Sequence, residues 1–465
     1  MAYDFDDINL SRRIRCFVTK ETVPGTPEFP AATDFICPAG DATINQASKT
    51  SDSKEMADTL DKLDKLPGGY DPAEWALPMY LRMGGIGVLP QGHALFRALQ
   101  GKFVTGLTAT VNGALADDAA DIPYEDADGV FPPVGVIRIG TETIRYTGNT
   151  GTSFTGCTRA YNSTVAATAA DGAAITLLTQ VYQQDPSAEK FTYWLMTDWF
   201  LQFVAGATIN ACTADIKNED GVLFSFKGQG TRMGFAAIGQ LAEAAAEGAT
   251  TIKIELPDGR AFAKAYSEGA RIQNKTKDAT NGTSGFKITD VDTDTNVITI
   301  SPAVPAGGWA EGDSIMGYLP PASPIGDIVL NRSTKILIDG TTGKFRSTSL
   351  SIGVPKDYKN DELGTVFPET VVPGERDINM ELDSYFRTAD TLRFGQAFTG
   401  DELAVEIQFG DTPGYRASLY MARAPIESPA LSRDSGTTAI KAKISALGSR
   451  TTDSVGENSL VIGLE

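Results

Sequence analysis

Two separate stretches of the chain carry the same pattern of strands and turns, and this repetition limits the possible folds more than any other feature. The first stretch, Lys190 to Gly230, predicts three antiparallel strands. Asp220-Gly221 supplies a tight turn, and in the strand after it Phe224 and Phe226 share one face. A hairpin turn followed by alternation of apolar and polar residues is typical of antiparallel sheet.

The second stretch, Glu402 to Gly448, repeats this pattern near the C-terminus. Its first strand places apolar residues on one face at every second position, from Leu403 to Phe409. Ser435-Gly436 stands where Asp220-Gly221 stood, and a further alternating strand follows it. The chain therefore uses one strand unit twice.

The segments before each unit also correspond. EWALPMYLR, ending at Arg82, aligns with NMELDSYFR, ending at Arg387, and HALFRALQG, ending at Gly101, aligns with LRFGQAFTG, ending at Gly400. Each half thus has an extended hairpin, a long polar loop, a strand, a short helix and a three-strand meander. The same order in both halves indicates duplication. We predict an all-β fold with two tandem sandwich or barrel domains, each with one short helix.

Two stretches of different composition interrupt the halves. Both are rich in Ala, Thr, Gly and Asp, and both contain short alternating strands. The predicted boundaries are residues 1–104 with 183–240 for the first domain, 105–182 and 241–320 for two small β-rich insertions, and 321–465 for the second domain. Asp128-Gly129 before Phe131 and Asp258-Gly259 before Phe262 suggest that the insertions are distant copies.

The charge of the chain limits its partners. Among 465 residues, 59 are acidic and 40 are Lys or Arg, which gives a net charge of -19. Nonspecific DNA binding requires clustered Lys and Arg, so this surface repels phosphates on average. Solubility alone also explains such a charge. The alternative is a surface that DNA passes without adhering.

No catalytic, cofactor or metal motif is found in the sequence. With His93 as its single histidine, the chain is a poor candidate for a His-based metal site or a Ser-His relay. The four cysteines are scattered and predict free thiols. Asp290, Asp292 and Asp294 alternate like calcium ligands but lack the glycine and the closing glutamate of an EF-hand. We therefore expect no enzyme and no cofactor.

Nothing in the sequence predicts export or membrane insertion. The first residues are acidic, and the most apolar segment, from Tyr193 to Ala207, is short and interrupted by polar residues. We expect a protein made in the cytoplasm with no membrane contact.

The chain resembles the tail tube proteins, or major tail proteins, of long-tailed (siphovirus-type) bacteriophages. The resemblance is carried by ETVPGTP, EWALPMYLR with GHALFRALQG, TINACTADIKNEDGVLFSFKGQG, and the C-terminal SLYMARAPIESPALSRDSGTTAIKAKISALG. It covers about residues 10–104, 183–240 and 325–465. Two tube domains in one chain are similar to the variant that assembles as trimeric, pseudo-hexameric rings.

The resemblance implies a structural virion protein of the viral tail, assembled in the host bacterial cytoplasm. Rings of the protein itself would stack into a hollow tube, and its other partners would be the tape measure, tail terminator and distal tail proteins. Phage DNA would pass through an acidic lumen without specific binding. The alternative from another class is a virion or cell-surface adhesin whose insertions bind carbohydrate.

Two sets of residues follow from this interpretation. The long polar loops, Lys49-Tyr70 and Lys356-Glu375, are predicted to reach the next ring. Their candidate contact residues are Lys49, Glu55, Asp61, Lys65, Lys356, Lys359, Asp361 and Glu369. The candidate core or subunit-packing residues are Trp75, Tyr80, Trp194, Trp199, Phe224, Phe226, Tyr385 and Phe386.

Overall fold

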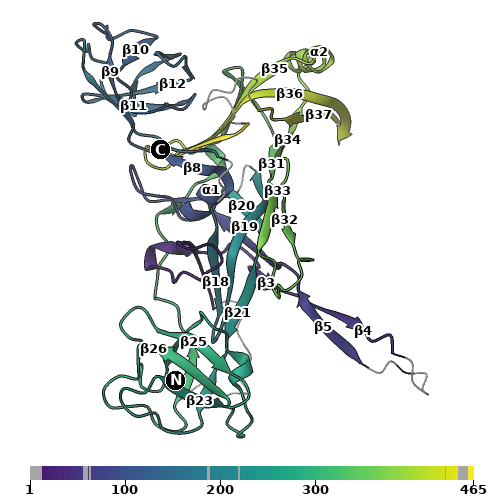
Figure 1. Cartoon of the computed structure of the whole chain (residues 1–465). Helices are drawn as coiled ribbons and strands as arrows, with labels where there is room; N and C mark the ends of the chain where they lie inside the picture. Colours follow the sequence, from purple (N-terminus) through teal and green to yellow (C-terminus); the bar gives the residue numbers. More distant parts are fainter. Residues whose placement is uncertain are drawn as a thin grey trace.

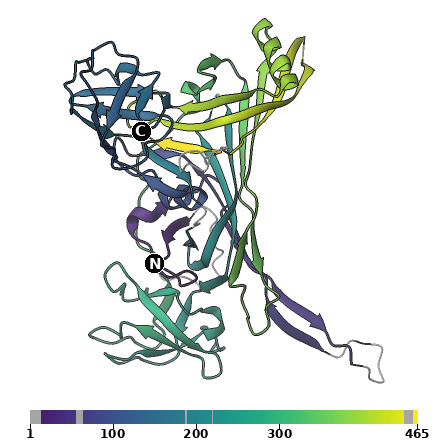
Figure 2. The ribbon, with the colours of Figure 1, turned by 45° about the horizontal axis from the view of Figure 1, so that its top comes forward.

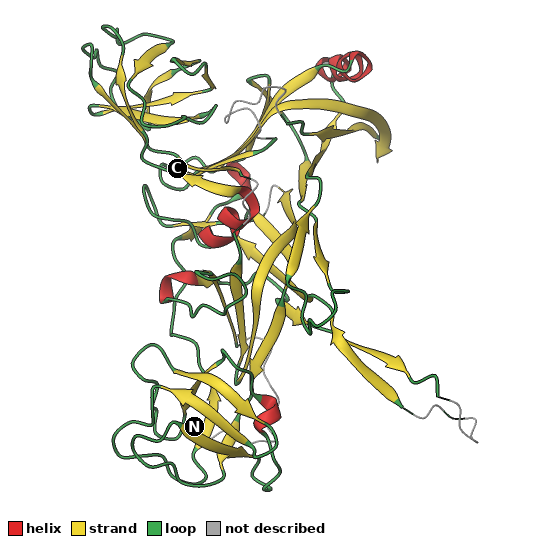
Figure 3. Ribbon diagram, in the orientation of Figure 1, coloured by secondary structure: helices red, strands yellow, loops and turns green. Residues whose placement is uncertain are grey.

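The computed structural model describes residues 13–55, 61, 64–185, 189–217, 220–434, 436–448 and 459–464. The protein is mostly β, with 51% strand against 7% helix, which confirms the predicted all-β class. Figure 3 shows long strands through the middle of the molecule and separate small β bodies at its ends. Within the described ranges, no helix has the length and apolar character that crossing a bilayer requires.

Two sets of strands, which we call repeat 1 and repeat 2, have the same connectivity. The first sheet of repeat 1 has the order β2 (Phe35–Ile36), β1 (Ile14–Lys20), β18 (Phe191–Thr197), β19 (Phe200–Lys217) and β21 (Arg232–Ala236). The matching sheet of repeat 2 has the order β30 (Thr341–Gly343), β29 (Lys335–Ile338), β35 (Glu402–Phe409), β36 (Ala417–Asp434) and β38 (Val461–Leu464). Register shifts fall at matching places, after Phe191 in one repeat and after Leu403 in the other.

Strands β19 and β36 are each 18 residues long and belong to two sheets. Their second halves enter one continuous antiparallel sheet, which we call the shared sheet. Its order is β3 (Thr43–Asn45), β6 (Ala73–Tyr80), β20 (Leu223–Gly230), β19, β31 (Ser347–Gly353), β34 (Asp377–Tyr385), β37 (Thr437–Ser445) and β36. Repeat 1 supplies the first four strands and repeat 2 the last four.

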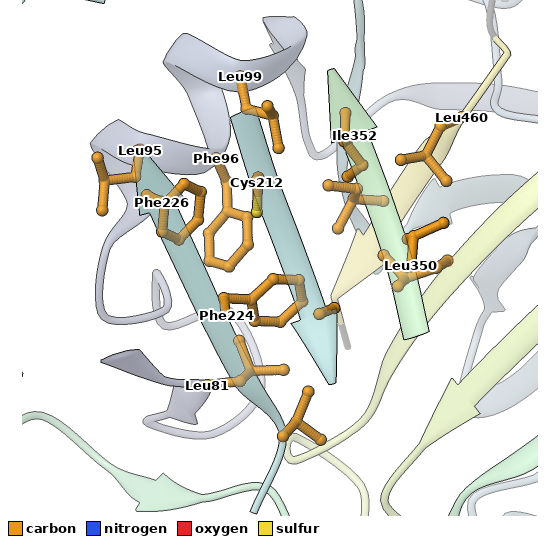
Figure 4. Close-up of a cluster of buried hydrophobic side chains, with 14 of the residues drawn as sticks. Leu81, Leu95, Phe96, Leu99, Cys212, Phe224, Phe226, Leu350, Ile352 and Leu460 are labelled. Atoms are coloured by element: carbon orange, nitrogen blue, oxygen red, sulfur yellow. The ribbon is translucent and has the colours of Figure 1, made fainter. Parts of the chain in front are cut away.

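Alternation along the strands explains why the two layers of each repeat pack. Val222, Phe224 and Phe226 are at most 1% exposed, as the period of two predicts. They join Phe96, Leu350 and Ile352 in one core that runs through both repeats (Figure 4). Burial of these apolar side chains is the main force that holds the two repeats together.

Each repeat contains one short helix, which follows strand β6 in repeat 1 and strand β34 in repeat 2. Helix α1 (His93–Gln100) ends at Gly101, whose N–H donates to the carbonyl of Arg97. Helix α2 (Thr391–Thr399) ends at Gly400, whose N–H donates to the carbonyl of Gln396. Both terminal glycines have positive φ, which glycine adopts without steric cost. Helix α1 lies in the middle of the molecule, whereas α2 lies at an outer corner (Figure 1).

Two small β bodies project from the repeats. Insertion 1 is an eight-stranded sheet of β9 (Thr108–Val111), β10 (Ile122–Glu125), β11 (Gly135–Ile139), β12 (Glu142–Tyr146), β13 (Gly148–Asn149), β14 (Ser153–Thr155), β15 (Thr158–Tyr161) and β16 (Ala174–Leu177). Insertion 2 is a closed barrel of β22 (Gly239–Leu241), β23 (Thr251–Glu255), β24 (Arg271–Asn274), β25 (Phe286–Asp292), β26 (Val297–Ser301) and β27 (Ser314–Gly317). The strands that lead into and out of insertion 1, β8 (Gly101–Val104) and β17 (Gln180–Gln184), extend the first sheet of repeat 2 beyond β38.

The insertions share a backbone hydrogen-bond framework. In insertion 1, Leu115 and Ala169 exchange both N–H···O bonds, and in insertion 2 Ala245 and Trp309 do the same. The N–H of Asn112 donates to the carbonyl of Pro123, as the N–H of Ala242 does to that of Lys253. This common framework supports the hypothesis that the insertions are distant copies.

Both long polar loops form two-stranded hairpins rather than irregular loops. Repeat 1 has β4 (Ser48–Asp52) with β5 (Lys65–Tyr70), and repeat 2 has β32 (Lys356–Lys359) with β33 (Thr370–Pro373). The first hairpin projects away from the body, whereas the second lies along the central strands (Figure 2). Residues 56–60, 62 and 63 of the first loop lie outside the described residues.

The remaining elements are short connections. They are β7 (Arg82–Met83), which pairs with β28 (Asp327–Ile328), and the 3-10 turns η1 (Ala32–Asp34), η2 (Ala263–Ala265), η3 (Asn331–Ser333) and η4 (Thr388–Asp390).

Candidate functional site: two matching edges of the shared sheet

The repeats are joined edge to edge where β19 meets β31. Seven residue pairs form this junction, from Ala211 opposite Gly353 to Lys217 opposite Ser347. At its centre Ala214 lies opposite Leu350, and both side chains are fully buried. The main-chain bonds of a strand pair depend little on sequence, so the same arrangement can recur wherever two such edges meet.

The strands equivalent to these two lie at the ends of the shared sheet with one side open. Among the described residues, the second half of β36 pairs only with β37, and β3 pairs only with β6. Leu431, on the β36 edge, is 53% exposed, and Ile44 on β3 is half-buried. Pro429 also lies on this part of β36, and proline is tolerated in sheets mainly at edges.

The strand registers show how the open edges correspond to the junction. Ala214 pairs with Phe224 of β20, and Leu431 pairs with Ile440 of β37. In the same way Leu350 pairs with Met380 of β34, while Ile44 pairs with Trp75 of β6. Because β20 corresponds to β37 and β6 to β34, Leu431 stands in the place of Ala214 and Ile44 in the place of Leu350.

One face of the shared sheet is polar and hollow. A depression of about 380 Å³ extends over β19, β31, β34 and β37 and reaches Ala430 of β36. The cross-strand registers place Glu427, Lys443, Glu381, Ser349 and Asp215 in one row across this face. The opposite face of the same strands is the apolar core, so we call the polar side the concave face.

The concave face carries charges of both signs. Lys443 approaches Glu427 at 3.7 Å, and Arg346 approaches Asp383 at 3.9 Å. Strand β31 adds the short hydroxyl side chains of Ser347, Ser349 and Ser351 to this face. The acidic excess of the chain is therefore not concentrated on this face.

The predicted packing residues do not all lie in the core. Trp75, Trp194, Phe224 and Phe226 are at most 3% exposed. Tyr80, Trp199 and Phe386 are half-buried, and Tyr385 is 45% exposed. Tyr385 is the last residue of β34. The Arg346 guanidinium lies 5.0 Å from the centroid of its ring.

The predicted loop residues are divided between the two hairpins. Lys49 and Lys65 lie on β4 and β5, and Glu55 and Asp61 lie in the connection between those strands. Lys356 and Lys359 lie on β32, with Asp361 and Glu369 between β32 and β33. Burial lowers the pKa of Lys356, which lies at the base of its hairpin rather than at the tip.

The base of the first hairpin contacts the segment that connects β32 and β33 in the second hairpin. The rings of Tyr70 and Phe367 stack with centroids 4.9 Å apart, and the N–H of Tyr70 donates to the carbonyl of Val366. Lys49 Nζ donates to the carbonyl of Asn360 at 3.3 Å. Only the outer part of the first hairpin is therefore free to reach a second molecule.

The second hairpin is anchored on repeat 1 by Tyr358. Its hydroxyl donates to the carbonyl of Gly206 at 2.8 Å and lies 3.1 Å from Thr208 Oγ1. Burial raises the pKa of this hydroxyl far above the physiological range. The hydroxyl is therefore a neutral anchor, and the second hairpin belongs to the junction between the repeats.

The residues considered for catalysis or metal binding have structural partners. His93 Nδ1 lies 2.8 Å from the Tyr182 hydroxyl, and burial lowers the pKa of the imidazole. All four cysteines are free, and burial raises the pKa of Cys16 and Cys157 to about 12. Asp292 caps a hairpin turn by accepting from the N–H groups of Asp294 and Thr295. Within the described ranges, no group of three or more His, Cys, Asp or Glu could hold a metal ion.

Sequence reasoning missed the open edges. Leu431 and Ile44 have the alternation of ordinary core residues, and alternation alone does not distinguish an edge strand from a central one. The prolines of β36, Pro425 and Pro429, were the available signal, since a central strand rarely contains them.

Comparison with protein-family models and with curated protein sequences found no match to this chain.

Proposed function

We propose that this protein is a structural subunit that assembles with copies of itself into trimeric, pseudo-hexameric rings, which stack into the hollow tail tube of a long-tailed bacteriophage. The observation that carries the proposal is the shared sheet, in which two repeats are already joined edge to edge. The open edges at its two ends are equivalent to the two strands of that internal junction.

Ring closure follows from repeating the internal junction between chains. If β36 of one copy pairs with β3 of the next, every second junction of the ring is covalently linked and the others are not. Contacts of this head-to-tail kind close into a ring when the rotation per subunit divides a full turn. Three chains with two repeats each then give six quasi-equivalent units. Closure also removes both open edges, which otherwise promote aggregation.

The concave face would line the channel in such a ring. Its lysines, Lys217, Lys441 and Lys443, are interspersed with the carboxylates of Asp215, Glu381 and Asp383, so the positive charge that would displace counterions from DNA is offset. Phage DNA would therefore pass without specific binding. The proposal includes the tape measure, tail terminator and distal tail proteins as further partners and the virion tail as the location. It assigns no catalytic activity and no cofactor.

The alternative of a carbohydrate-binding adhesin has less support. Sugar binding by an insertion would use exposed aromatic rings, but Tyr124, Phe131, Tyr146 and Phe154 are at most 5% exposed. Tyr161 is half-buried, with the guanidinium of Arg416 over its ring at 4.8 Å. Trp309 and Phe286 of insertion 2 are also buried.

Electron microscopy of the purified protein tests the proposal. We expect stacked rings or long hollow tubes in negative stain, and trimers by native mass spectrometry at low concentration. A protein that remains monomeric at all concentrations, without rings or tubes, would contradict the proposal. Binding of the same monomers to glycans would favour the adhesin.

Two opposite charges, introduced one after the other, test the register in which the open edges pair. Leu431→Lys should abolish ring closure and leave a folded monomer, because a central lysine would be buried opposite Ile44 of the next copy. Adding Ile44→Glu should restore rings by pairing the two charges. Leu363→Lys is the matched control, since Leu363 is fully exposed on the second hairpin. Normal rings from Leu431→Lys alone would rule out this register.

Deletion of the projecting part of the first hairpin tests the stacking of rings. Removal of Lys49-Tyr70 should leave a folded protein that no longer forms tubes, because this hairpin is the element that extends furthest from the body (Figure 2). Circular dichroism checks the fold and negative stain checks the assembly. Tubes of normal length from the deletion would exclude an inter-ring role for this hairpin.

A further inference from the structure

Helix α1 is buried where the two repeats meet. Leu95, Phe96 and Leu99 are at most 3% exposed, and they belong to the same apolar core as Ile352 and Leu460 of repeat 2 (Figure 4). The Gln100 side chain donates to the carbonyl of Leu460 and accepts from Arg376 Nη2 at 2.6 Å. The C-terminal end of α1 therefore packs against repeat 2 at the internal junction.

Helix α2 occupies the equivalent place in repeat 2 without such a cover. None of its residues is buried, and Phe398 is 94% exposed. Phe398 stands two residues before the capping Gly400, as Leu99 stands two residues before the capping Gly101. A large apolar side chain is therefore exposed on α2 at the place where α1 buries Leu99.

The strand registers identify the surface that corresponds to Leu460 and Ile352. Strand β21 of repeat 1 corresponds to β38 of repeat 2. Leu201 pairs with Ala236 in the first repeat, and the equivalent Ser418 pairs with Gly463 in the second. Counting along both strands from these pairs, Met233 corresponds to Leu460. Ile44 and Gln46 correspond to Leu350 and Ile352. Met233 is half-buried, and its N–H donates to Gln46 Oε1 at 2.8 Å. An apolar patch of Met233 and Ile44 therefore lies at the open end of repeat 1.

We propose that Phe398 of one copy docks on the Met233–Ile44 patch of a second copy, as the C-terminal end of α1, with Leu99 and Gln100, joins the core that contains Leu460 and Ile352 within the chain. This inference rests on the proposed ring and names a contact within it. The flexible Met233 side chain fits the larger ring of phenylalanine in place of leucine. The contact would seal the intermolecular junction beside the β36–β3 edge.

Substitution of Phe398 tests the contact. Phe398→Asp should raise the concentration needed for ring formation by roughly tenfold or more, because a buried aromatic anchor at an interface is lost. The thermal transition of the monomer should not move, since the side chain is exposed there. Val165→Asp, at a side chain 80% exposed on insertion 1, is the matched control and should assemble like the unmodified protein.

A disulfide trap gives a second, geometric readout. Phe398→Cys with Met233→Cys, in a chain that also carries Cys37→Ser and Cys157→Ser, should form intermolecular disulfides on oxidation, seen as dimers and trimers on non-reducing gels. Normal assembly of Phe398→Asp together with an absence of these disulfides would overturn the contact and leave the ring intact. If the unmodified protein forms no rings at all, the proposed function itself fails.

Discussion

The first sheets of the two repeats differ in the face that each turns toward an insertion. In repeat 1 this face is apolar, with Phe17, Trp194, Leu201 and Phe203 fully buried against the barrel of insertion 2. Gly317 of insertion 2 lies so close to Leu201 that a Cβ atom there would approach the Leu201 Cβ to 2.5 Å. Repeat 1 and insertion 2 therefore share one core.

The same face of repeat 2 is more polar, although Val181, Val461 and Tyr420 pack against the core of insertion 1. The registers put Glu406 in the place of Trp194 and Ser418 in the place of Leu201. Here insertion 1 is held by Arg145, whose Nη2 donates to both carboxylate oxygens of Glu406 at 2.6 and 2.8 Å. The comparison shows that one sheet framework can carry an insertion either through an extensive apolar core or through a smaller apolar contact together with an ion pair.

Deletion of each insertion should give the largest difference between the repeats. Replacing residues 239–317 by a short turn exposes Phe17, Trp194 and Phe203 together, and an apolar patch of this kind promotes aggregation. Replacing residues 106–178 between the paired strands β8 and β17 exposes a smaller apolar area, from Val181, Val461 and Tyr420. We expect insoluble protein from the first deletion and soluble, folded protein from the second, measured by fractionation and circular dichroism. Equal solubility of the two deletion variants would contradict the difference between the two faces.

Single substitutions at the equivalent positions should show the same contrast on a smaller scale. Trp194→Ala should cost about 3–5 kcal/mol of the free energy of unfolding, because it leaves a large cavity in the shared core. Glu406→Gln should cost about 2 kcal/mol through weaker hydrogen bonds to Arg145. Denaturant unfolding measures both. A larger loss from Glu406→Gln than from Trp194→Ala would contradict the difference in character between the two faces.

The smallest expected effect is a pH dependence confined to repeat 1. Burial raises the pKa of Glu21, although the N–H groups of Gly25 and Gly206 and the Thr192 hydroxyl donate to its carboxylate. Because the folded pKa is above the unfolded one, the ionised group destabilises the fold, and this penalty is lost as the pH falls through the folded pKa. The thermal transition of the unmodified protein should rise relative to Glu21→Gln between pH 7 and pH 5. An unchanged difference would show that Glu21 is not perturbed.

Much of the fold could be predicted from local pattern. Alternation identified the buried faces of β20 and β35, and the capping glycines at 101 and 400 marked the ends of both helices. The repeated order of strands, turns and helix was also visible. These features depend on residues close together in the sequence, where side-chain periodicity and turn geometry act directly.

The candidate site was less predictable. Tyr385 was expected among the packing residues and is 45% exposed, whereas Ile44, Leu431 and Phe398 were not singled out. Both long polar loops were expected to reach the next ring, and the structure shows two hairpins, one projecting and one anchored by Tyr358. Each of these outcomes depends on contacts between residues far apart in the chain.

The sequence by itself determined that the chain forms antiparallel sheets from two copies of one unit, because alternation and turn residues specify strands and their faces locally. Only the tertiary structure decided which strands become neighbours. The pairing of β19 with β31 leaves β36 and β3 open, and main-chain hydrogen bonds carry no side-chain signal that would reveal this choice. The position of each insertion was decided in the same way, by the apolar or polar character of an outer face assembled from distant strands.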